Sequence, residues 1–363
     1  MSLVLVVNAG SSSLKLSMLD GDDVVAGSEL DGWDGHDTSG LARLADRAGP
    51  PDAVGHRVVH GGPDLRGPVA LTAEVEAAIE ALTPLAPLHQ PRALAGMRAA
   101  RRVFPGVPAV VSFDTAFHAT MPAAAATYAI PLEWREMGIR RYGFHGLSHA
   151  WASRRAAELI GRPIDDLRLV TAHLGAGASL CAVDGGRSVD TTMGFTPLDG
   201  LVMATRAGSI DPGALLYLQR EHAVSAPEIE AVLERRSGLL GLFGPSGDMR
   251  EVEAGLGHGD EAARLAYDVY VHRLRSSVGA MAASLGGLDA IVFTGGIGEH
   301  ASHVRADTCG GLGHLGLELD LTANQAAAAD ADVSKPGAPA ATLVVTARED
   351  RQIAAETRHT LAR

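Results

Sequence analysis

Cysteine is nearly absent from this 363-residue chain, which has only Cys181 and Cys309. Two thiols so far apart cannot form a disulfide framework for a chain of this size, and they show no metal-ligand spacing. The N-terminal segment also lacks the basic region and long apolar run of a signal peptide, and it falls short of the ~20 apolar residues of a membrane span. We therefore expect a cytoplasmic protein with no membrane partner.

Positive charge is scarce as well. The chain has 31 Lys and Arg residues against 43 Asp and Glu residues, a net charge of −12, which argues against nucleic acid or an anionic membrane as a partner. Lysine occurs only at Lys15 and Lys335, so a lysine inside a motif stands out. Apolar residues are plentiful at 46%, and the length predicts two folded domains.

A strand, glycine loop and second strand occur twice. The apolar run at 3–7 predicts a buried strand, it stops at a loop over 8–13, and residues 14–19 alternate as a second strand before a turn. The same plan returns at 167–185, about 165 residues later. Such self-similarity suggests duplication, although strand–loop–strand units also recur by chance in α/β proteins.

The remaining segments predict an α/β fold with helices on the faces of the sheets. Further strands are expected at 109–113 and 290–293, and helices at 72–82, 90–104, 148–160, 228–236 and 260–285. Because no Pro-, Gly- or Ser-rich linker separates the halves, we expect two domains that share a cleft.

Three glycine loops indicate a mononucleotide site. The first carries Ser11, Ser13 and Lys15, but it lacks the second glycine and the following helix of a Walker A motif, so it is interpreted as a phosphate-binding hairpin. Loops at 175–178 and 294–300 also follow strands, and the latter opens a helix. Taken alone, any one of them is more simply a turn.

Charged side chains beside strands supply candidate catalytic groups. Arg57 lies at a strand-to-loop junction, Arg206 precedes a helix, and Asp114 follows a buried strand, where ligand sites of α/β sheets collect. Each could instead be a solvated surface side chain. His145 and His149 have the i,i+4 spacing of zinc ligands, but the glutamate of that motif is missing, so a capping or core role suits His149 better and a phosphoryl contact stays open for His145.

Several of these stretches occur in the order found in the acetokinase family, a branch of the superfamily of sugar kinases, heat-shock chaperones and actin, and the chain resembles that family over nearly its whole length. The matching segments are 7–15, 56–62, 86–91, 113–118, 142–146, 193–198 and 293–299. The resemblance implies two ribonuclease H-like (actin-like ATPase) domains with duplicated topology and an interdomain active-site cleft. By position these would be residues 1–145, completed by a C-terminal helix at 350–363, and residues 146–349, in a homodimer.

The activity implied by the resemblance is reversible, Mg²⁺- or Mn²⁺-dependent transfer of the ATP γ-phosphoryl group to acetate. Asn8 and Glu349 would hold the metal, although Asp350 is an alternative to Glu349, and the catalytic residues would be Arg57, Asp114, His145 and Arg206. The acetate methyl pocket would comprise Val59, Leu88, Phe144 and Pro197. The ATP and ADP contacts would be Ser11, Ser13, Lys15, His173, Leu174, Gly175, Ala176, Gly177, Asp248, Met249, Arg250, Gly296, Ile297, Gly298, Glu299 and His300.

Departures from the family pattern leave alternatives open. Ala176 and His300 stand where the family usually has asparagine, which affects nucleotide affinity or preference. Val59 narrows the pocket relative to alanine, so acetate should be preferred over propionate, by the ~1–3 kcal/mol that a methylene contributes. The alternatives are a propionate or butyrate kinase, and a catalytically impaired actin-like nucleotide-binding protein.

Overall fold

The computed structural model describes residues 3–10, 13–328 and 330–363. The chain divides into two compact units. The first unit consists of Met1–Ala119, Phe144–Trp151 and Arg348–Arg363, and the second of Thr120–Gly143 and Ala152–Ala347. The C-terminal segment therefore returns to the unit that the N-terminal segment builds.

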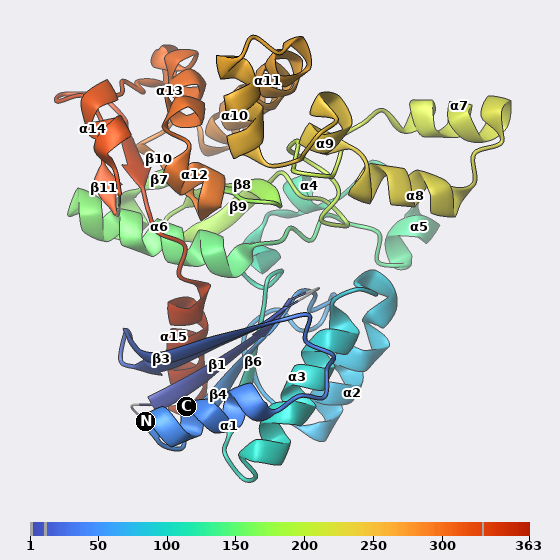
Figure 1. Ribbon diagram of the computed structural model, residues 1–363, viewed down its shortest axis with the longest axis vertical. Helices are drawn as coiled ribbons and strands as arrows, with labels where there is room; N and C mark the ends of the chain where they lie inside the picture. The colour runs from blue at the N-terminus through green and yellow to red at the C-terminus, as the bar shows by residue number, and fades with distance from the viewer. Residues whose placement is uncertain (1–2, 11–12, 329) are drawn as a thin grey trace. The chain divides into compact units, whose positions relative to one another are not determined.

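Each unit has one mixed six-stranded sheet (Figure 1). The strands of the first sheet are β1 (Leu3–Ala9), β2 (Ser13–Asp20), β3 (Asp23–Asp31), β4 (Ala53–Val58), β5 (Val69–Ala70) and β6 (Ala109–Phe113). The strands of the second sheet are β7 (Arg168–Leu174), β8 (Ala178–Asp184), β9 (Arg187–Thr191), β10 (Ala290–Thr294), β11 (Ala331–Asp332) and β12 (Ala341–Val344).

The two sheets have the same topology. The first runs β3-β2-β1-β4-β6-β5, and the second, taken from its other edge, runs β9-β8-β7-β10-β12-β11. In both, an antiparallel meander of three strands is followed by two parallel strands and a short antiparallel edge strand. Even the register shift recurs, between Met18 and Leu19 in one sheet and between Ala182 and Val183 in the other. The predicted α/β class and duplicated topology are confirmed.

Helices account for most of the remaining chain. In the first unit they are α1 (Ser39–Ala48), α2 (Ala73–Ala81), α3 (Gln90–Val103) and α15 (Glu349–Leu361), together with the start of α6 (Gly146–Ile160). The second unit contains the rest of α6 and α4 (Ala123–Ala126), α5 (Leu132–Glu136), α7 (Pro212–His222), α8 (Ala226–Arg235), α9 (Gly238–Phe243), α10 (Met249–Gly257), α11 (Glu261–Leu285), α12 (Gly295–His300), α13 (Ser302–Gly310) and α14 (Leu321–Ala326).

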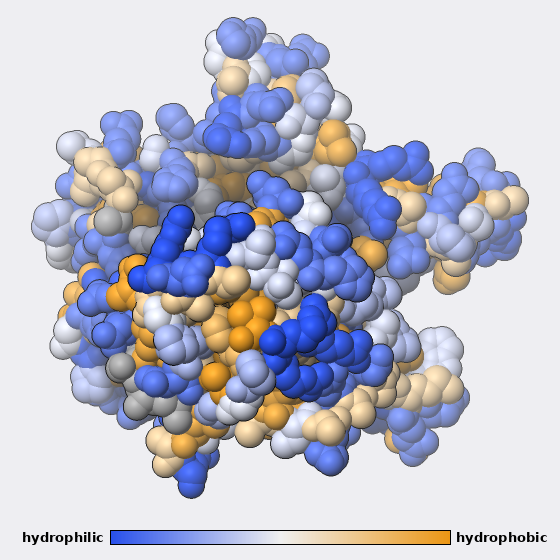
Figure 2. All heavy atoms as spheres, turned by 60° about the horizontal axis from the view of Figure 1, so that its bottom comes forward, coloured by the Kyte–Doolittle hydropathy of each residue, from blue (hydrophilic) through white to orange (hydrophobic). Residues whose placement is uncertain are grey.

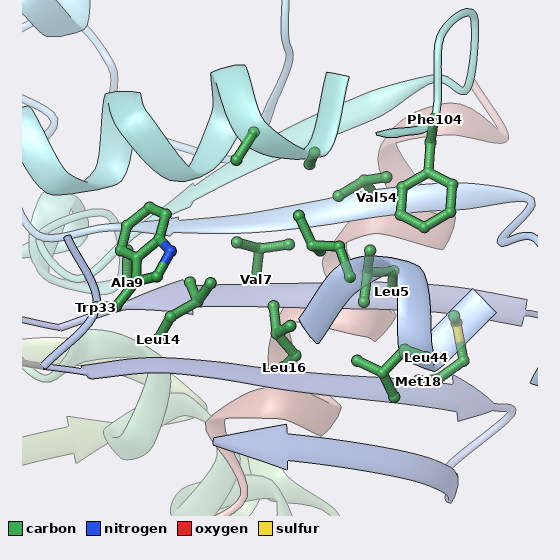
Figure 3. Close-up of a cluster of buried hydrophobic side chains, with 13 residues drawn as sticks. Leu5, Val7, Ala9, Leu14, Leu16, Met18, Trp33, Leu44, Val54 and Phe104 are labelled. Atoms are coloured by element: carbon green, nitrogen blue, oxygen red, sulfur yellow. The ribbon is translucent and has the colours of Figure 1, made fainter. Parts of the chain in front are cut away.

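Strand β1 is buried on both faces, which explains its continuous run of apolar residues. Leu5 and Val7 pack with Leu14 and Leu16 of β2 and with side chains of α1 and α3 (Figure 3). Val4 and Val6 alternate with them and pack on the other face, against α15 and the first turn of α6. The first sheet is therefore a central layer between helices, and this fixes where its strand ends lie.

Polar and apolar residues are mixed on the face of the molecule seen in Figure 2. On the face in Figure 2, hydrophobic residues (orange) occur in small groups among hydrophilic ones (blue). Among the described residues, no helix is both long and apolar enough to cross a membrane. Both cysteines are buried free thiols.

Candidate functional site

Three neighbouring parallel strands of the first sheet bring polar residues to one edge. Asn8 lies near the end of β1, Arg57 near the end of β4, and Asp114 directly after β6. Because β4 lies between β1 and β6, and all three run in the same direction, their carboxyl ends meet. Glu349, the first residue of α15, joins this group from the C-terminal segment.

Arg57 is the centre of the cluster. Its Nε and Nη2 donate to the two carboxylate oxygens of Asp114 at 2.9 and 2.5 Å, the two-pronged geometry in which arginine binds carboxylates. Its Nη1 donates to Oδ1 of Asn8 at 3.1 Å, and its Nε lies 3.9 Å from Oε2 of Glu349. The Arg57 side chain is 17% exposed and that of Asp114 is 2% exposed, so a buried carboxylate holds a partly exposed guanidinium in place.

Charge in this cluster is only partly balanced. Burial by itself would lower the pKa of Arg57, but Asp114 and Glu349 outweigh it and hold that pKa above its ordinary value. Burial, with Asp114 and Asp350 nearby, raises the pKa of Glu349, while Arg57 and Lys15 oppose this. A carboxylate in such surroundings gains from an added cation.

His145 is brought next to this cluster by an unusual backbone. It adopts a left-handed conformation with φ of +57°, which is rare for a residue other than glycine. The following Gly146 donates its N–H to the carbonyl of Asp114 at 2.8 Å, and a Cβ at Gly146 would lie 2.2 Å from that oxygen. The glycine therefore allows a close approach that ties His145 to Asp114, and it places His145 before α6 rather than on it.

The residues expected around the acetate methyl group differ in their surroundings. Val59 and Phe144 are buried in the first unit, whereas Leu88 is 49% exposed there. Pro197 belongs to the second unit. His149 is fully buried, and its ring makes an edge contact with His118, in keeping with the core role expected for it.

Arg206 lies in the second unit in a different setting. Its Nη1 contacts the sulfur of Met203 at 3.8 Å, and among the described residues no carboxylate lies within salt-bridge distance of it. Burial lowers its pKa, partly offset by the attraction of Glu234. Arg206 is thus a half-buried cation whose charge is available to an anion.

The second unit contains a cavity of about 540 Å³, a size typical of ligand sites. It is built from the β7–β8 loop, the start of α10, helix α12 and the chain around Thr205. The lining residues are Gly175, Ala176, Ala204, Thr205, Gly247, Asp248, Met249, Arg250, Glu253, Gly296, Ile297, His300 and Ala301. Three segments expected to contact the nucleotide therefore surround one cavity.

A glycine allows the start of α12 to pack closely against the end of β7. Gly295 has φ of +78°, and a Cβ there would lie 2.9 Å from the carbonyl oxygen of Leu174 at the end of β7. Leu174 itself is fully buried and does not line the cavity. The start of α12 and the β7–β8 loop consequently form adjoining walls.

Charged groups in the cavity are few. Asp248 caps α10 by accepting from the N–H of Arg250, and the two side chains form an ion pair with Nη2–Oδ2 at 2.5 Å. Hydrogen bonds from the Arg250 side chain and backbone lower the pKa of Asp248. Burial raises the pKa of Glu253, which lies one turn further along α10. Sequence reasoning missed Glu253 and Thr205, which no motif signal singles out.

The candidate nucleotide-binding residues of the first hairpin do not gather in one cluster among the described residues. Lys15 pairs across the sheet with Asn8, and its Nζ forms a 3.2 Å ion pair with Glu29 at the surface. The carbonyl of Ser13 accepts from the N–H of Gly10 and closes the loop. Ser11 lies outside the described residues.

The donor set at the edge of the first sheet suits a hard divalent cation. Mg²⁺ prefers oxygen ligands and is commonly bound by one or two protein groups, with phosphates and water completing the shell. Asn8 and Glu349 offer an amide oxygen, which accepts one hydrogen bond from Arg57, and a carboxylate in one cluster. Both oxygens of Asp350 accept from the guanidinium of Arg348. This geometry favours Glu349 over Asp350 as a ligand.

Comparisons with known proteins agree with the motif resemblance. Residues 44–355 match the model of the acetokinase family. An acetate kinase of Synechococcus sp. (strain JA-2-3B'a(2-13)) is 52% identical over 315 residues, 87% of this chain and 78% of that protein. The crystal structure of Porphyromonas gingivalis acetate kinase superposes with a TM-score of 0.93 at 37% identity, covering 99% of this chain and 100% of that one. A propionate kinase from Francisella tularensis subsp. tularensis SCHU S4 gives a TM-score of 0.89 at 36% identity, with the same coverage. The chain belongs to the acetokinase family.

Proposed function

We propose that this chain is an acetate kinase, which transfers the γ-phosphoryl group of ATP to acetate and gives acetyl phosphate and ADP, reversibly. One observation supports this proposal most directly. The guanidinium of Arg57 donates to both carboxylate oxygens of Asp114 at the carboxyl ends of the strands, in a chain that belongs to the acetokinase family. A fixed, half-buried cation of this kind suits a small carboxylate or a phosphoryl group.

The chemistry needs positioning more than proton transfer. A carboxylate oxygen of acetate attacks the γ-phosphorus, the bond to the bridging oxygen of ADP breaks, and negative charge spreads over the transferring group. Because acetate is ionised near neutral pH, no general base is required. We assign Asp114 to orienting Arg57, and Arg57, Arg206 and His145 to stabilising the developing charge. Arg57 belongs to the first unit and Arg206 to the second.

Asn8 and Glu349 are the residues we assign to Mg²⁺ or Mn²⁺. When bound, the metal neutralises phosphate charge and orients the phosphates. Burial, with Asp114 and Asp350 nearby, raises the pKa of Glu349, so a bound cation would stabilise its carboxylate. Within the chain itself, Arg57 orients Asn8 through the Nη1–Oδ1 hydrogen bond.

We assign the cavity of the second unit to the nucleotide. The backbone of the β7–β8 loop and of Gly296 suits phosphate oxygens, while Met249, Ile297 and Ala301 offer apolar surface to a base. His173, Gly177 and Gly298 flank the cavity in sequence. Ala176 and His300 replace asparagine, so at each of these positions the nucleotide loses a side-chain amide that could form a hydrogen bond with it.

The decisive experiment is an assay of the purified protein with acetate, ATP and Mg²⁺, in which acetyl phosphate is trapped as its hydroxamate. Hydroxamate that forms only when all three are present supports the proposal. Arg57→Gln should abolish it, while Arg220→Gln, at an exposed arginine of α7, should not. Absence of product from the wild-type protein would sink the assignment.

Propionate kinase is the second candidate, and the similarity to the Francisella structure favours testing it. We expect kcat/KM to fall from acetate to propionate to butyrate, because Val59 and Phe144 are buried and leave little freedom to enlarge the pocket. The step per methylene should be about 10-fold, within the range set by one methylene. A higher kcat/KM for propionate than for acetate would reassign the substrate.

Two further expectations belong to the same proposal. A cytoplasmic location suits the two buried free thiols, because such a chain does not depend on disulfides. A homodimer would use exposed apolar side chains, of which α5 and the residue after it carry Leu132, Trp134 and Met137. Sedimentation of the purified protein would test the dimer directly.

A further inference from the structure

One carboxylate oxygen of Glu299 in α12 is bound by the backbone of its own unit, and Glu299 is not among the residues that line the cavity. Its Oε1 accepts from the N–H of Gly295 at 3.0 Å, four residues earlier in the same helix. The same oxygen accepts from the N–H of Ala347 at 3.0 Å, 48 residues away in sequence. One carboxylate oxygen thus joins the first turn of α12 to the segment that follows β12.

Arg305 holds the other end of α12. It is 1% exposed, and its Nη1 donates to the carbonyls of Gly298 and Glu299 at 2.9 and 2.8 Å. Its Nε and Nη2 donate to Oδ1 and the carbonyl of Asn324, both at 2.7 Å. The guanidinium therefore links the last turn of α12 to α14 without using a carboxylate.

Helix α12 depends on such contacts for its shape. It has six residues, of which Gly295, Gly296 and Gly298 are glycines, and a short glycine-rich helix has almost no stability of its own. Yet Gly296, Ile297 and His300 form one wall of the cavity. Helix α12 can have its binding conformation before a ligand arrives only if side chains outside the cavity fix its backbone.

The second hydrogen bond of Glu299 is made at the end of the second unit. Ala347 is the last residue of the second unit, and Arg348 begins the segment that returns to the first. Glu349, which we assign to the metal, follows two residues after Ala347. Fixing the Ala347 N–H therefore also fixes where the chain leaves the second unit on its way to Glu349.

We propose that Glu299 is a positioning residue, which sets the nucleotide wall and the backbone that leads to Glu349 by accepting two hydrogen bonds, and does not itself contact nucleotide or metal. Arg305 supports the same wall from its other end. This inference rests on the proposed function, and it changes the role that the family resemblance gives to Glu299.

Three substitutions separate positioning from direct contact. Glu299→Gln keeps an oxygen that can accept both bonds and removes the charge, Glu299→Asp keeps the charge but withdraws the oxygen, and Glu299→Ala removes both. We expect Gln to bind ADP within about threefold of wild type, and Asp and Ala to bind about tenfold more weakly or worse, the scale of one or two lost hydrogen bonds. Glu318→Ala, at an exposed glutamate that pairs with Lys335, is the matched control.

Calorimetric titration with ADP gives the binding constants, and steady-state kinetics supplies the second readout. In the Asp variant the KM for ATP and the Mg²⁺ concentration for half-activation should rise, while the KM for acetate stays at its wild-type value. A Gln variant that binds ADP as weakly as the Asp variant, or that fails to fold, overturns the inference, as does an Asp variant with wild-type constants. Failure of the proposed function is recognised separately, because it depends on hydroxamate formation by the wild-type protein alone.

Discussion

Arg57 and Arg206 carry the same charge in different surroundings. Arg57 is saturated on two sides, by Asp114 and Asn8, so its orientation is fixed before any ligand arrives. Among the described residues, the side chain of Arg206 has a sulfur contact at 3.8 Å and no paired carboxylate, and burial lowers its pKa. A paired guanidinium is suited to binding a carboxylate in the ground state, whereas an unpaired one gains most when charge develops on a transferring group.

Replacing Arg206 by alanine should therefore lower kcat by on the order of a thousandfold or more, by analogy with arginine fingers of other phosphoryl-transfer enzymes. The cost falls on kcat because the interaction that is lost forms mainly in the transition state. Steady-state assays of hydroxamate formation would measure it, with Arg220→Ala as an exposed control in the same unit. A kcat within tenfold of wild type would remove Arg206 from the catalytic machinery.

At the scale of elements, α15 is the part that places Glu349. Glu349 is its first residue, and its buried side packs on β1, β4 and β6, where Ile353 is fully buried beside Val4 and Val6. The approach is close, since a Cβ at Gly55 of β4 would lie 2.7 Å from Cγ2 of Ile353. The docking of one helix thus decides where a proposed metal ligand stands.

Ile353→Ala should lower the free energy of unfolding by about 2–5 kcal/mol, because it leaves a cavity at this contact. Urea denaturation followed by circular dichroism would measure the loss. His359→Ala, on the exposed side of the same helix, serves as the control and should change stability by less than about 0.5 kcal/mol. An equal effect of both substitutions would mean that α15 is not docked through Ile353.

The elements that were predicted most closely have a buried face, although α1, which also has one, was not predicted. The strand at 109–113 and the long helix near 260–285 were predicted almost to the residue, because their apolar residues follow one period. The helix expected after Arg206 was given no bounds, because none of the residues of α7 is buried, and β3, which alternates only between exposed and half-exposed positions, was not predicted. The motifs indicated Arg57 and Asp114 one by one, but their bidentate pairing depends on β4 and β6 being neighbours, which no local pattern encodes.

At the scale of the whole molecule, duplication gives two similar sheets whose strand ends have diverged. The end of β1 and the strands beside it carry an amide, a guanidinium and a carboxylate, whereas the corresponding end of β7 leads into a loop of small residues. A net charge of −12 makes the few buried cations the main attraction for anionic substrates. One fold is thus used twice, once for a charged cluster and once for a cavity lined by backbone.

The first unit should also limit the acid stability of the protein. Burial, with Arg101 nearby, lowers the pKa of His56 in β4 to about 3, and burial lowers that of His60 to about 4. Since unfolded histidine titrates near pH 6.5, the unfolded chain takes up protons first as the pH falls. Each histidine therefore contributes stability that is present above about pH 6.5 and is lost at about 1.4 kcal/mol per pH unit down to its folded pKa.

The urea midpoint should accordingly fall steeply between pH 7 and pH 5. His56→Gln removes one of the two titrating groups, so whatever its stability at pH 7, its midpoint should depend less on pH than that of the wild type. His258→Gln, at an exposed histidine of the second unit, is the control and should leave the wild-type slope unchanged. If His56→Gln shows the same slope as the wild type, the buried imidazole of His56 does not control this transition, and His60 or the carboxylates of the molecule must account for it.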